Sequence, residues 1–277
     1  MRKNALLILI LMVCALYSFA QKTDSTHFHY SQWENYRSMI NKRVASIYVD
    51  VALIDFAPLA NHSSIVLLSL KMKESDVDGL ATMREAKQLL AIEDSLVKNI
   101  HLAGNIVYAG NIVTRGNKDF YFYTDSVTNC STVIQETLAS FPGYKYKIQT
   151  EDDTYWAFYA EVLYPREEYQ QIIENTKTVL VLSQNGDPLT TAREVKHIIH
   201  FRDIYNREDF ITKIAKQKYT VLEKKNSEDP FYPYALIISR KDLVDIYSVN
   251  EYTLDLWYLA REYNGNYAGW QTVLRKD

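Results

Sequence analysis

The chain has 277 residues with 31 basic and 34 acidic side chains, and hydrophobic residues make up 47% of it. No basic stretch stands out that would neutralise the phosphates of a nucleic acid, so this balance argues against direct nucleic-acid binding. The hydrophobic fraction is sufficient for a sizeable core, and the length exceeds the roughly 100 to 200 residues of an ordinary domain. The composition therefore predicts a globular protein with two domains.

The N-terminal twenty residues have the pattern of a secretion signal. Arg2 and Lys3 precede an apolar run over residues 5–15, and the small-residue site Ser18-Phe19-Ala20 follows it. We expect cleavage after Ala20, which leaves a periplasmic or secreted protein. The run is shorter than the roughly twenty apolar residues that cross a bilayer, so no membrane anchor is expected. Only Cys130 of the two cysteines then stays in the chain, and no disulfide is expected.

Residues 28–163 are expected to form the first α+β domain. In chain order we predict an ordered stretch over 33–40, strands over 45–53 and 64–72, a helix over 82–102, strands over 105–114 and 118–124, a helix from 126 to 142, a strand over 144–150 and a strand or bridging segment over 156–162. The turn around Pro58 predicts a hairpin between the strands 45–53 and 64–72. Because the strand 64–72 is apolar on both faces, we expect it near the centre of the sheet.

The helix over 82–102 is expected to be amphipathic and to end at Gly104. Its predicted inward positions are Ala86, Leu89, Leu90, Val97 and Ile100, and its predicted outward positions are Glu85, Asp94 and Lys98. The sequence Arg115-Gly116-Asn117 predicts the hairpin turn between the two strands that follow.

Residues 164–277 are expected to repeat the same order after a long helix over 165–182. The turn Asn185-Gly186-Asp187-Pro188 ends that helix. We then predict a strand over 194–202, a helix over 207–218, strands over 219–225 and 235–240, a helix over 248–264 and a strand over 267–274. Ser248 and Glu251 have the spacing of a capping box at the start of the last helix.

Both halves thus have the order βαββαβ, which is the split pattern of ferredoxin-like folds. In the first half this order begins at residue 64 and is preceded by one additional strand. The predicted fold class is α+β, with two ferredoxin-like sandwich units that have antiparallel sheets and are joined by a long helix. An internal duplication and two separate units of one fold are both consistent with this pattern.

Tyrosine is the most unusual feature of the composition, with 22 residues. Aromatic residues alternate in strand-like stretches such as Phe120-Tyr121-Phe122-Tyr123. One interpretation is packing within a sheet, with the hydroxyls reaching solvent. The other is an aromatic recognition surface, because tyrosine provides a large contact area at a small entropic cost.

The chemistry-bearing residues do not form a recognisable catalytic or metal pattern. His197 and His200 lie three apart in a predicted strand and therefore point to opposite faces, which disfavours a shared metal ion. Cys130 falls within an amphipathic helix and is expected to be a small buried side chain. An acid and base pair among Asp50, Asp55 or residues 151–153 would require folding to bring two carboxylates together. We expect no metal, no cofactor and no enzymatic activity.

One group of residues near the start of the second half is a candidate binding patch. It comprises Trp156, Tyr159, Asp187, Arg193 and His197, with Gly186 and Arg202 nearby in the sequence. Under a purely structural interpretation, Asp187 is a turn residue, Arg193 lies at a strand edge and His197 is a core residue. The alternative is a polar contact surface for a partner.

Two stretches of the chain resemble known families. The first resembles the family called domain of unknown function 695 over residues 33–164, through Ala45-Ser46-Ile47-Tyr48-Val49-Asp50, Ile92-Glu93-Asp94 and residues 110–125 with Lys118-Asp119-Phe120-Tyr121-Phe122-Tyr123. The rest is similar to the regulator of ribonuclease E activity B family, through Tyr164-Pro165, Gly186-Asp187, Arg193-Glu194-Val195, His197 and Phe210. The resemblance implies a two-part α+β protein without known enzymatic activity. Its second part would be similar to a protein inhibitor that binds an endoribonuclease and slows RNA decay.

Three hypotheses follow for the function. The leading one is an exported, non-enzymatic module that binds another protein or a peptide through sheet edges and aromatic surface. The second is a ribonuclease regulator, as the family resemblance implies. The third is a hydrolase that uses Asp or His residues from both halves, which requires two carboxylates, or His197 and Asp187, within hydrogen-bonding distance.

Overall fold

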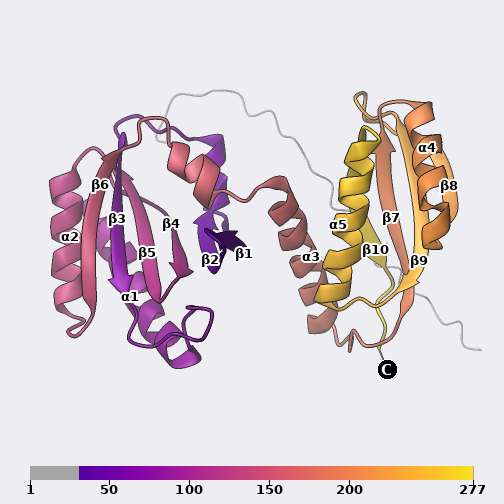
Figure 1. Cartoon of the computed structure of the whole chain (residues 1–277). Coiled ribbons are helices and arrows are strands. Elements are labelled where there is room, and N and C mark those ends of the chain that lie inside the picture. Colours follow the sequence, from indigo (N-terminus) through magenta and orange to yellow (C-terminus); the bar gives the residue numbers. More distant parts are fainter. Residues whose placement is uncertain (1–30, 277) are drawn as a thin grey trace, which may run out of the picture. The chain divides into compact units, whose positions relative to one another are not determined.

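The computed structural model describes residues 31–276 (Figure 1). The expected secretion signal over residues 1–20 lies outside the described residues. The described chain contains two antiparallel sheets with helices packed against them, so the predicted α+β fold class is confirmed. Across residues 31–276, no helix combines the length and the apolar character that a membrane span requires.

The N-terminal part, residues 31–164, is built on a six-stranded sheet. Its elements are β1 (Trp33–Ile40), β2 (Arg43–Asp50), a short 3₁₀ turn (Val51–Asp55), β3 (Ser64–Lys71), α1 (Met83–Ala103), β4 (Val107–Thr114), β5 (Asn117–Thr124), α2 (Val127–Ala139), β6 (Lys145–Asp152) and a π-helical segment (Tyr159–Leu163). The strand order is β1-β2-β4-β5-β3-β6. The last four strands have the ferredoxin-like order that the sequence predicts, and β3 is paired on both sides, as expected.

The predicted hairpin between strands 45–53 and 64–72 is wrong. β2 pairs instead with β1, through a tight turn at Asn41 and Lys42, which both have positive φ. The other side of β2 pairs with β4, whereas β3 pairs with β5 and β6. The chain leaves β2 through the 3₁₀ turn, so the loop at Pro58 joins strands that are not neighbours. The ferredoxin-like unit is therefore preceded by two strands rather than one.

Helix α1 begins and ends as predicted, but its buried face is rotated. The side chain of Thr82 caps the first turn by accepting from the backbone N–H of Glu85, and Gly104 follows the last turn with a φ of 65°. The buried positions are Glu85, Leu89, Ile92, Glu93, Leu96 and Ile100. Glu85 is thus buried rather than outward, because its carboxylate accepts a hydrogen bond from the backbone N–H of Lys73 at 3.0 Å. Leu90 and Val97, expected in the core, are 57% and 37% exposed.

Because Phe and Tyr alternate along β5, the two faces of this strand belong to two different hydrophobic layers. Phe120 and Phe122 pack under α1 and α2, whereas Tyr121 and Tyr123 pack on the opposite face, against the π-helical segment. The hydroxyl of Tyr123 does not reach solvent as one interpretation expected, because it donates to the carboxylate of Asp153 at 2.6 Å. In this strand both tyrosines are core residues, and the hydroxyl of Tyr123 has a hydrogen-bond partner.

The segment 156–162 is helical and not a strand. Asp153 initiates it, because its carboxylate accepts from the backbone N–H groups of Ala157 and Phe158 at 2.7 and 3.1 Å. Trp156 has a φ of 55° and stacks on Tyr123 with 3.8 Å between ring centroids. The acidic stretch 151–153 therefore ends in a helix cap.

The C-terminal part is built on a four-stranded sheet and starts with the joining helix. Its elements are α3 (Glu167–Gln184), β7 (Arg193–Phe201), α4 (Ile204–Ile214), a 3₁₀ turn (Ala215–Gln217), β8 (Thr220–Asn226), β9 (Tyr234–Asp242), α5 (Ile246–Glu262) and β10 (Gly265–Thr272). The strand order β10-β7-β9-β8 is again ferredoxin-like. The predicted capping box does not form, because Asp245 caps α5 and also accepts from the hydroxyl of Ser248 at 2.6 Å.

Helix α3 is anchored by a buried asparagine. The side-chain amide of Asn175 donates to Thr253 and Asn250 on α5, at 2.7 and 2.9 Å. Its carbonyl oxygen accepts from the indole N–H of Trp270 on β10 at 2.9 Å. The helix ends at Asn185, and Gly186 follows with a φ of 87°, as the turn signal predicts.

Candidate functional site

The five residues of the predicted binding patch do not form one cluster. Trp156 and Tyr159 belong to the core of the N-terminal part. Asp187, Arg193 and His197 are buried in the C-terminal part. All five side chains are therefore enclosed by the chain, and the buried Nε and Nη2 of Arg193 and Nε2 of His197 have no hydrogen-bond partner among residues 31–276.

Asp187 and Arg193 form a buried ion pair at 2.8 Å, with 1% or less of either side chain exposed. The carboxylate also accepts from the backbone N–H groups of Leu189 and Arg275, at 2.9 Å each. Burial alone would raise the pKa of Asp187, but these N–H groups and the guanidinium hold that pKa below its ordinary value. The ion pair and these hydrogen bonds connect the turn after α3, strand β7 and the C-terminal segment.

His197 lies in an aromatic enclosure rather than beside Asp187. Its Nδ1 is 2.8 Å from the hydroxyl of Tyr267, and Tyr219 and Tyr252 meet its ring edge to face. Burial, and next the charge of Arg240, lower the pKa of His197 to about 3, so the ring is neutral at physiological pH. His200 is on the opposite face of β7, as its spacing predicts. Among residues 31–276, no group of three or more His, Cys, Asp or Glu side chains is arranged to hold a metal ion.

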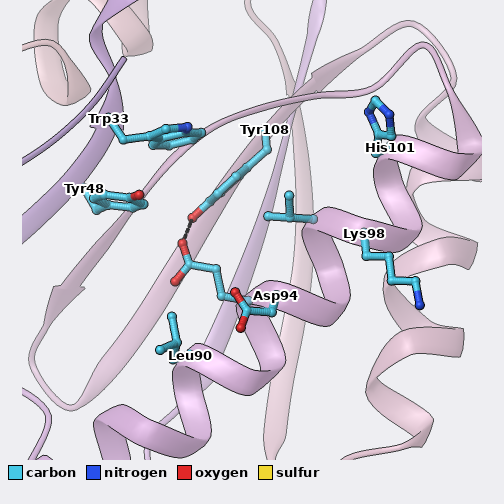
Figure 2. Close-up of a pocket in the computed structure, with 9 residues that line it drawn as sticks. Trp33, Tyr48, Leu90, Asp94, Lys98, His101 and Tyr108 are labelled. Atoms are coloured by element: carbon cyan, nitrogen blue, oxygen red, sulfur yellow. Dashed lines mark hydrogen bonds between the residues drawn. The ribbon is translucent and has the colours of Figure 1, made fainter. Parts of the chain in front are cut away.

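The structure brings a different set of side chains together, in a groove between α1 and the strands β1, β2 and β4 (Figure 2). The groove has a volume of about 480 Å³. It is lined by Trp33, Tyr48, Leu90, Glu93, Asp94, Val97, Lys98, His101 and Tyr108. The β1–β2 pair creates it, because these two strands widen the sheet beyond the face that α1 and α2 cover.

Three aromatic rings form the floor of the groove. Trp33 stacks on Tyr48 with 4.8 Å between ring centroids, and its ring centroid is 5.2 Å from that of Tyr108. The three residues come from the adjacent strands β1, β2 and β4. Trp33 and Tyr48 are half-buried and face the groove, whereas Tyr108 is 9% exposed and supports them from the core side.

A β-bulge in β4 determines which side chains reach the groove. The register shifts between Tyr108 and Gly110, so Tyr108 and Asn111 face the same side although they are three residues apart. Gly110 has a φ of 154°, and a Cβ atom at this position would lie 2.4 Å from the carbonyl oxygen of Tyr48. Glycine is required there because β2 passes so close to β4.

Glu93 is held at the base of the groove by a closed polar network. Its Oε1 accepts from the hydroxyl of Tyr108 at 2.6 Å and from the amide of Asn111 at 3.0 Å. Its Oε2 is 2.5 Å from the ammonium of Lys118, with 9% of each of these two side chains exposed. The amide of Asn111 also donates to the Tyr108 hydroxyl at 2.7 Å. All four groups are mutually satisfied, which fixes the floor in one arrangement.

Carboxylates affect the ionisation of the tyrosines at the aromatic end of the groove. Burial raises the pKa of Tyr48, and the carboxylates of Glu93, Asp50 and Asp94 raise it further. Burial and then Glu93 likewise raise the pKa of Tyr108. Asp94 is exposed on α1 beside Glu93, and Lys98 extends away from the rings of Trp33 and Tyr48 (Figure 2).

The sequence pattern does not mark these residues as a site. Leu90 and Val97 were expected in the core, and Asp94 was expected only to face outward. The available signal was Glu93, a charged residue four positions after Leu89 on the buried stripe of α1, opposite a lysine in the next hairpin. Tyr48, Glu93, Asn111 and Lys118 all fall in the three segments that carry the resemblance to the first family.

The comparisons with known proteins agree with the predicted order of families. Residues 31–164 match the model of a family of unknown function (DUF695), and residues 172–272 match the model of the regulator of ribonuclease activity B family. The groove lies within the first match. A search of curated proteins found no match.

Two solved structures show a partial likeness. An unknown protein from Galdieria sulphuraria has 10% sequence identity and a TM-score of 0.21, and the match covers 76% of this chain and 99% of that one. A proposed glycine cleavage system transcriptional repressor has 9% identity and a TM-score of 0.23, with coverage of 76% and 98%. Scores this low carry no argument about function. In chain order, the chain therefore matches the DUF695 family model and then the model of the regulator of ribonuclease activity B family.

Proposed function

We propose that this protein is an exported, non-enzymatic binding module that holds a segment of another protein in the groove between α1 and strands β1, β2 and β4. The observation that carries this proposal is the pre-formed aromatic floor of Trp33, Tyr48 and Tyr108, supported from below by the Glu93 network. A volume of about 480 Å³ falls in the size range of known ligand sites.

The walls of the groove favour a peptide segment as the occupant. Leu90 and Val97 lie two helical turns apart on α1 and present exposed apolar side chains along the groove. The rings of Trp33 and Tyr48 line the groove from the sheet side. An extended chain with one or two large side chains would bury all of this apolar surface, which is the main source of affinity in such contacts.

The role of Glu93 also favours binding over catalysis. Both of its carboxylate oxygens are engaged, by Tyr108 and Asn111 on one side and by Lys118 on the other. A general base must receive a proton from a substrate. A carboxylate that is ion-paired and hydrogen-bonded in this way instead keeps the surrounding rings in place.

Peptide display tests this function. A random-peptide library is selected on the chain from Gln21 to Asp277, and binders are measured against two variants. Leu90→Asp changes a groove wall, whereas Leu102→Asp changes an exposed leucine of the same helix that does not line the groove. We expect the selected peptides to lose at least ~10-fold in affinity with Leu90→Asp, because a charge replaces apolar contact area. They should be unaffected by Leu102→Asp. Equal loss in both variants, or a selection that enriches no peptide, would refute the proposal.

A second candidate function is regulation of a ribonuclease, favoured by the match of residues 172–272 to the regulator of ribonuclease activity B family. This function would use the C-terminal part and not the groove. To test this function, the purified chain is added to an endoribonuclease, and the rate of RNA cleavage is measured. Slower cleavage that persists in the Leu90→Asp variant would support it, and unchanged cleavage at excess protein would exclude it.

Export is the remaining part of the proposal and is tested separately. Cell fractionation followed by mass spectrometry of the intact protein should find it outside the cytosol with Gln21 as the first residue. A cytosolic protein that keeps residues 1–20 would remove this part of the proposal without affecting the groove.

A further inference from the structure

We propose that the groove selects a basic side chain, so that the bound segment carries an arginine or lysine whose cationic end lies against the rings of Trp33 and Tyr48 beside Asp94. This inference rests on the proposed binding function and names the chemistry of its ligand.

The ring pair provides the face for a cation. Trp33 and Tyr48 stack with an interplanar angle of 21°, and both rings line the groove. The face of an aromatic ring is negative, and tryptophan attracts cations most strongly among aromatic side chains. A planar guanidinium can lie parallel to such a ring, which favours arginine over lysine.

The carboxylates at this end add to the attraction. Lys118 neutralises Glu93, but Asp94 is exposed on α1 and lines the groove. After burial, Glu93 and Asp50, Asp94 also raises the pKa of the Tyr48 hydroxyl. A bound cation would therefore meet both a ring face and an unneutralised carboxylate.

Other aromatic rings of this chain already have a basic side chain of the chain itself over their face. Arg261 lies over Trp257 at 4.6 Å, and Arg240 lies over Tyr219 at 4.3 Å, measured to the ring centroid. Among residues 31–276, no basic side chain is found over Trp33 or Tyr48. Lys98, a basic residue that lines the groove, points away from both rings (Figure 2).

The two basic groups at the other end of the groove define the competing outcome. Lys98 and His101 line the groove near the end of α1. An anionic ligand would instead bind to these two residues, and its affinity would not fall when Asp94 is replaced. The experiment must therefore compare ligands that differ in charge and variants that differ at both ends.

The test uses short acetylated and amidated peptides of alanine with one central residue: arginine, lysine, citrulline or glutamate. Citrulline has the shape of arginine without its charge. Binding is followed by NMR on the chain from Gln21 to Asp277, through the indole N–H signal of Trp33, which is assigned by its loss in Trp33→Phe. The protein variants are Asp94→Asn, Lys98→Gln and the control Leu102→Asp.

We expect the arginine peptide to shift the Trp33 signal in a saturable way, with lysine weaker and citrulline weaker by at least ~5-fold. Asp94→Asn should weaken the arginine peptide by ~3-fold or more. Lys98→Gln removes a positive charge from the groove lining and should not weaken it, and Leu102→Asp, outside the groove, should leave it unchanged. Equal binding of citrulline, preferred binding of glutamate, or no binding of the arginine peptide would overturn the inference.

This outcome is separable from that of the proposed function. If displayed peptides bind in the groove but carry no basic residue, the binding function stands and the proposed preference of the groove for a basic side chain is wrong. If the arginine peptide binds but display enriches nothing, the groove is a site for small cations and the protein-binding function fails.

Discussion

The carboxylate of Glu93 on α1 and the ammonium of Lys118 on β5 form a buried ion pair, 2.5 Å apart and with 9% of each side chain exposed. Such a pair contributes little net stability, because both charges lose their hydration. Its effect is organisation: it fixes Glu93, which in turn positions Tyr108 and Asn111. The aromatic floor of the groove thus depends on this charge pair.

Removing one member of this pair should destabilise the protein strongly. Lys118→Met leaves the Glu93 carboxylate buried without its counter-charge, and we expect a loss of about 3–5 kcal/mol in the free energy of unfolding. The double variant Glu93→Gln with Lys118→Met should recover most of this loss, because the glutamine oxygen still accepts from Tyr108. Urea unfolding measures both. Lys98→Met, on the exposed face of α1, is the control and should change stability by less than about 0.5 kcal/mol. A Lys118→Met protein as stable as the control would contradict the role of the pair.

Gly110→Ala should be more harmful than alanine at the comparable bulge of the second sheet. A Cβ at Gly110 would lie 2.4 Å from the Tyr48 carbonyl oxygen, whereas one at Gly269, with a φ of 126°, meets nothing within 4 Å. Both substitutions carry the strain of positive φ, but only the first forces β2 and β4 apart. We expect Gly110→Ala to cost at least about 2 kcal/mol more than Gly269→Ala in urea unfolding. A similar loss of stability in both variants would show that the close approach of β2 and β4 does not determine the effect of Gly110→Ala.

His197 should make the protein less stable in mild acid. Its pKa is about 3 in the folded chain against an ordinary value of 6.5, so only the unfolded chain binds a proton between these two values. The contribution of the neutral ring is complete above pH 6.5 and decreases as the pH falls toward 3, by about 1.4 kcal/mol per pH unit at most. Unfolding in urea between pH 4 and 7 measures the slope. His197→Gln should reduce the slope markedly, whereas His200→Gln, at a half-buried ring whose pKa is also lowered, should reduce it less. An unchanged slope in His197→Gln would be the contrary result.

Cys130 should be inert in the folded protein. Burial raises the pKa of its thiol to about 12, and none of the side chain is exposed. Because the thiolate is the reactive form, a thiol reagent at pH 8 should label the chain from Gln21 only as fast as it unfolds. The labelling rate should rise with urea in parallel with unfolding. Rapid labelling without denaturant would show that α2 opens locally.

The repeated ferredoxin-like order could be predicted from the sequence because its signals are local. The strand over 64–72 is apolar on both faces, and Arg115-Gly116 has the positive φ values that its turn requires. The helix bounds also followed from local signals, with Thr82 and Gly104 at the two ends of α1. By contrast, the β1–β2 pair was missed, because Asn41 and Lys42 form a tight turn without the usual glycine.

The groove could not be predicted because it depends on the rotation of α1 by one residue and on a bulge. Leu90 and Val97 fit a helical stripe as well as Leu89 and Leu96 do, and only packing against the sheet decides between them. Tyr108 and Asn111 would face opposite sides in a regular strand. The residues of the predicted patch, Trp156, Tyr159, Asp187, Arg193 and His197, are buried in separate cores, because closeness in sequence does not bring residues of two cores together.

The most direct measurement of the central claim is the set of intermolecular nuclear Overhauser effects between the arginine peptide and the chain. If the groove is the binding site, the side-chain methylene protons of the arginine should show contacts to the ring protons of Trp33 and Tyr48, and the flanking alanines should show contacts to Leu90 or Val97. Contacts confined to exposed rings elsewhere, such as Tyr155 or Phe231, would show that binding takes place outside the groove.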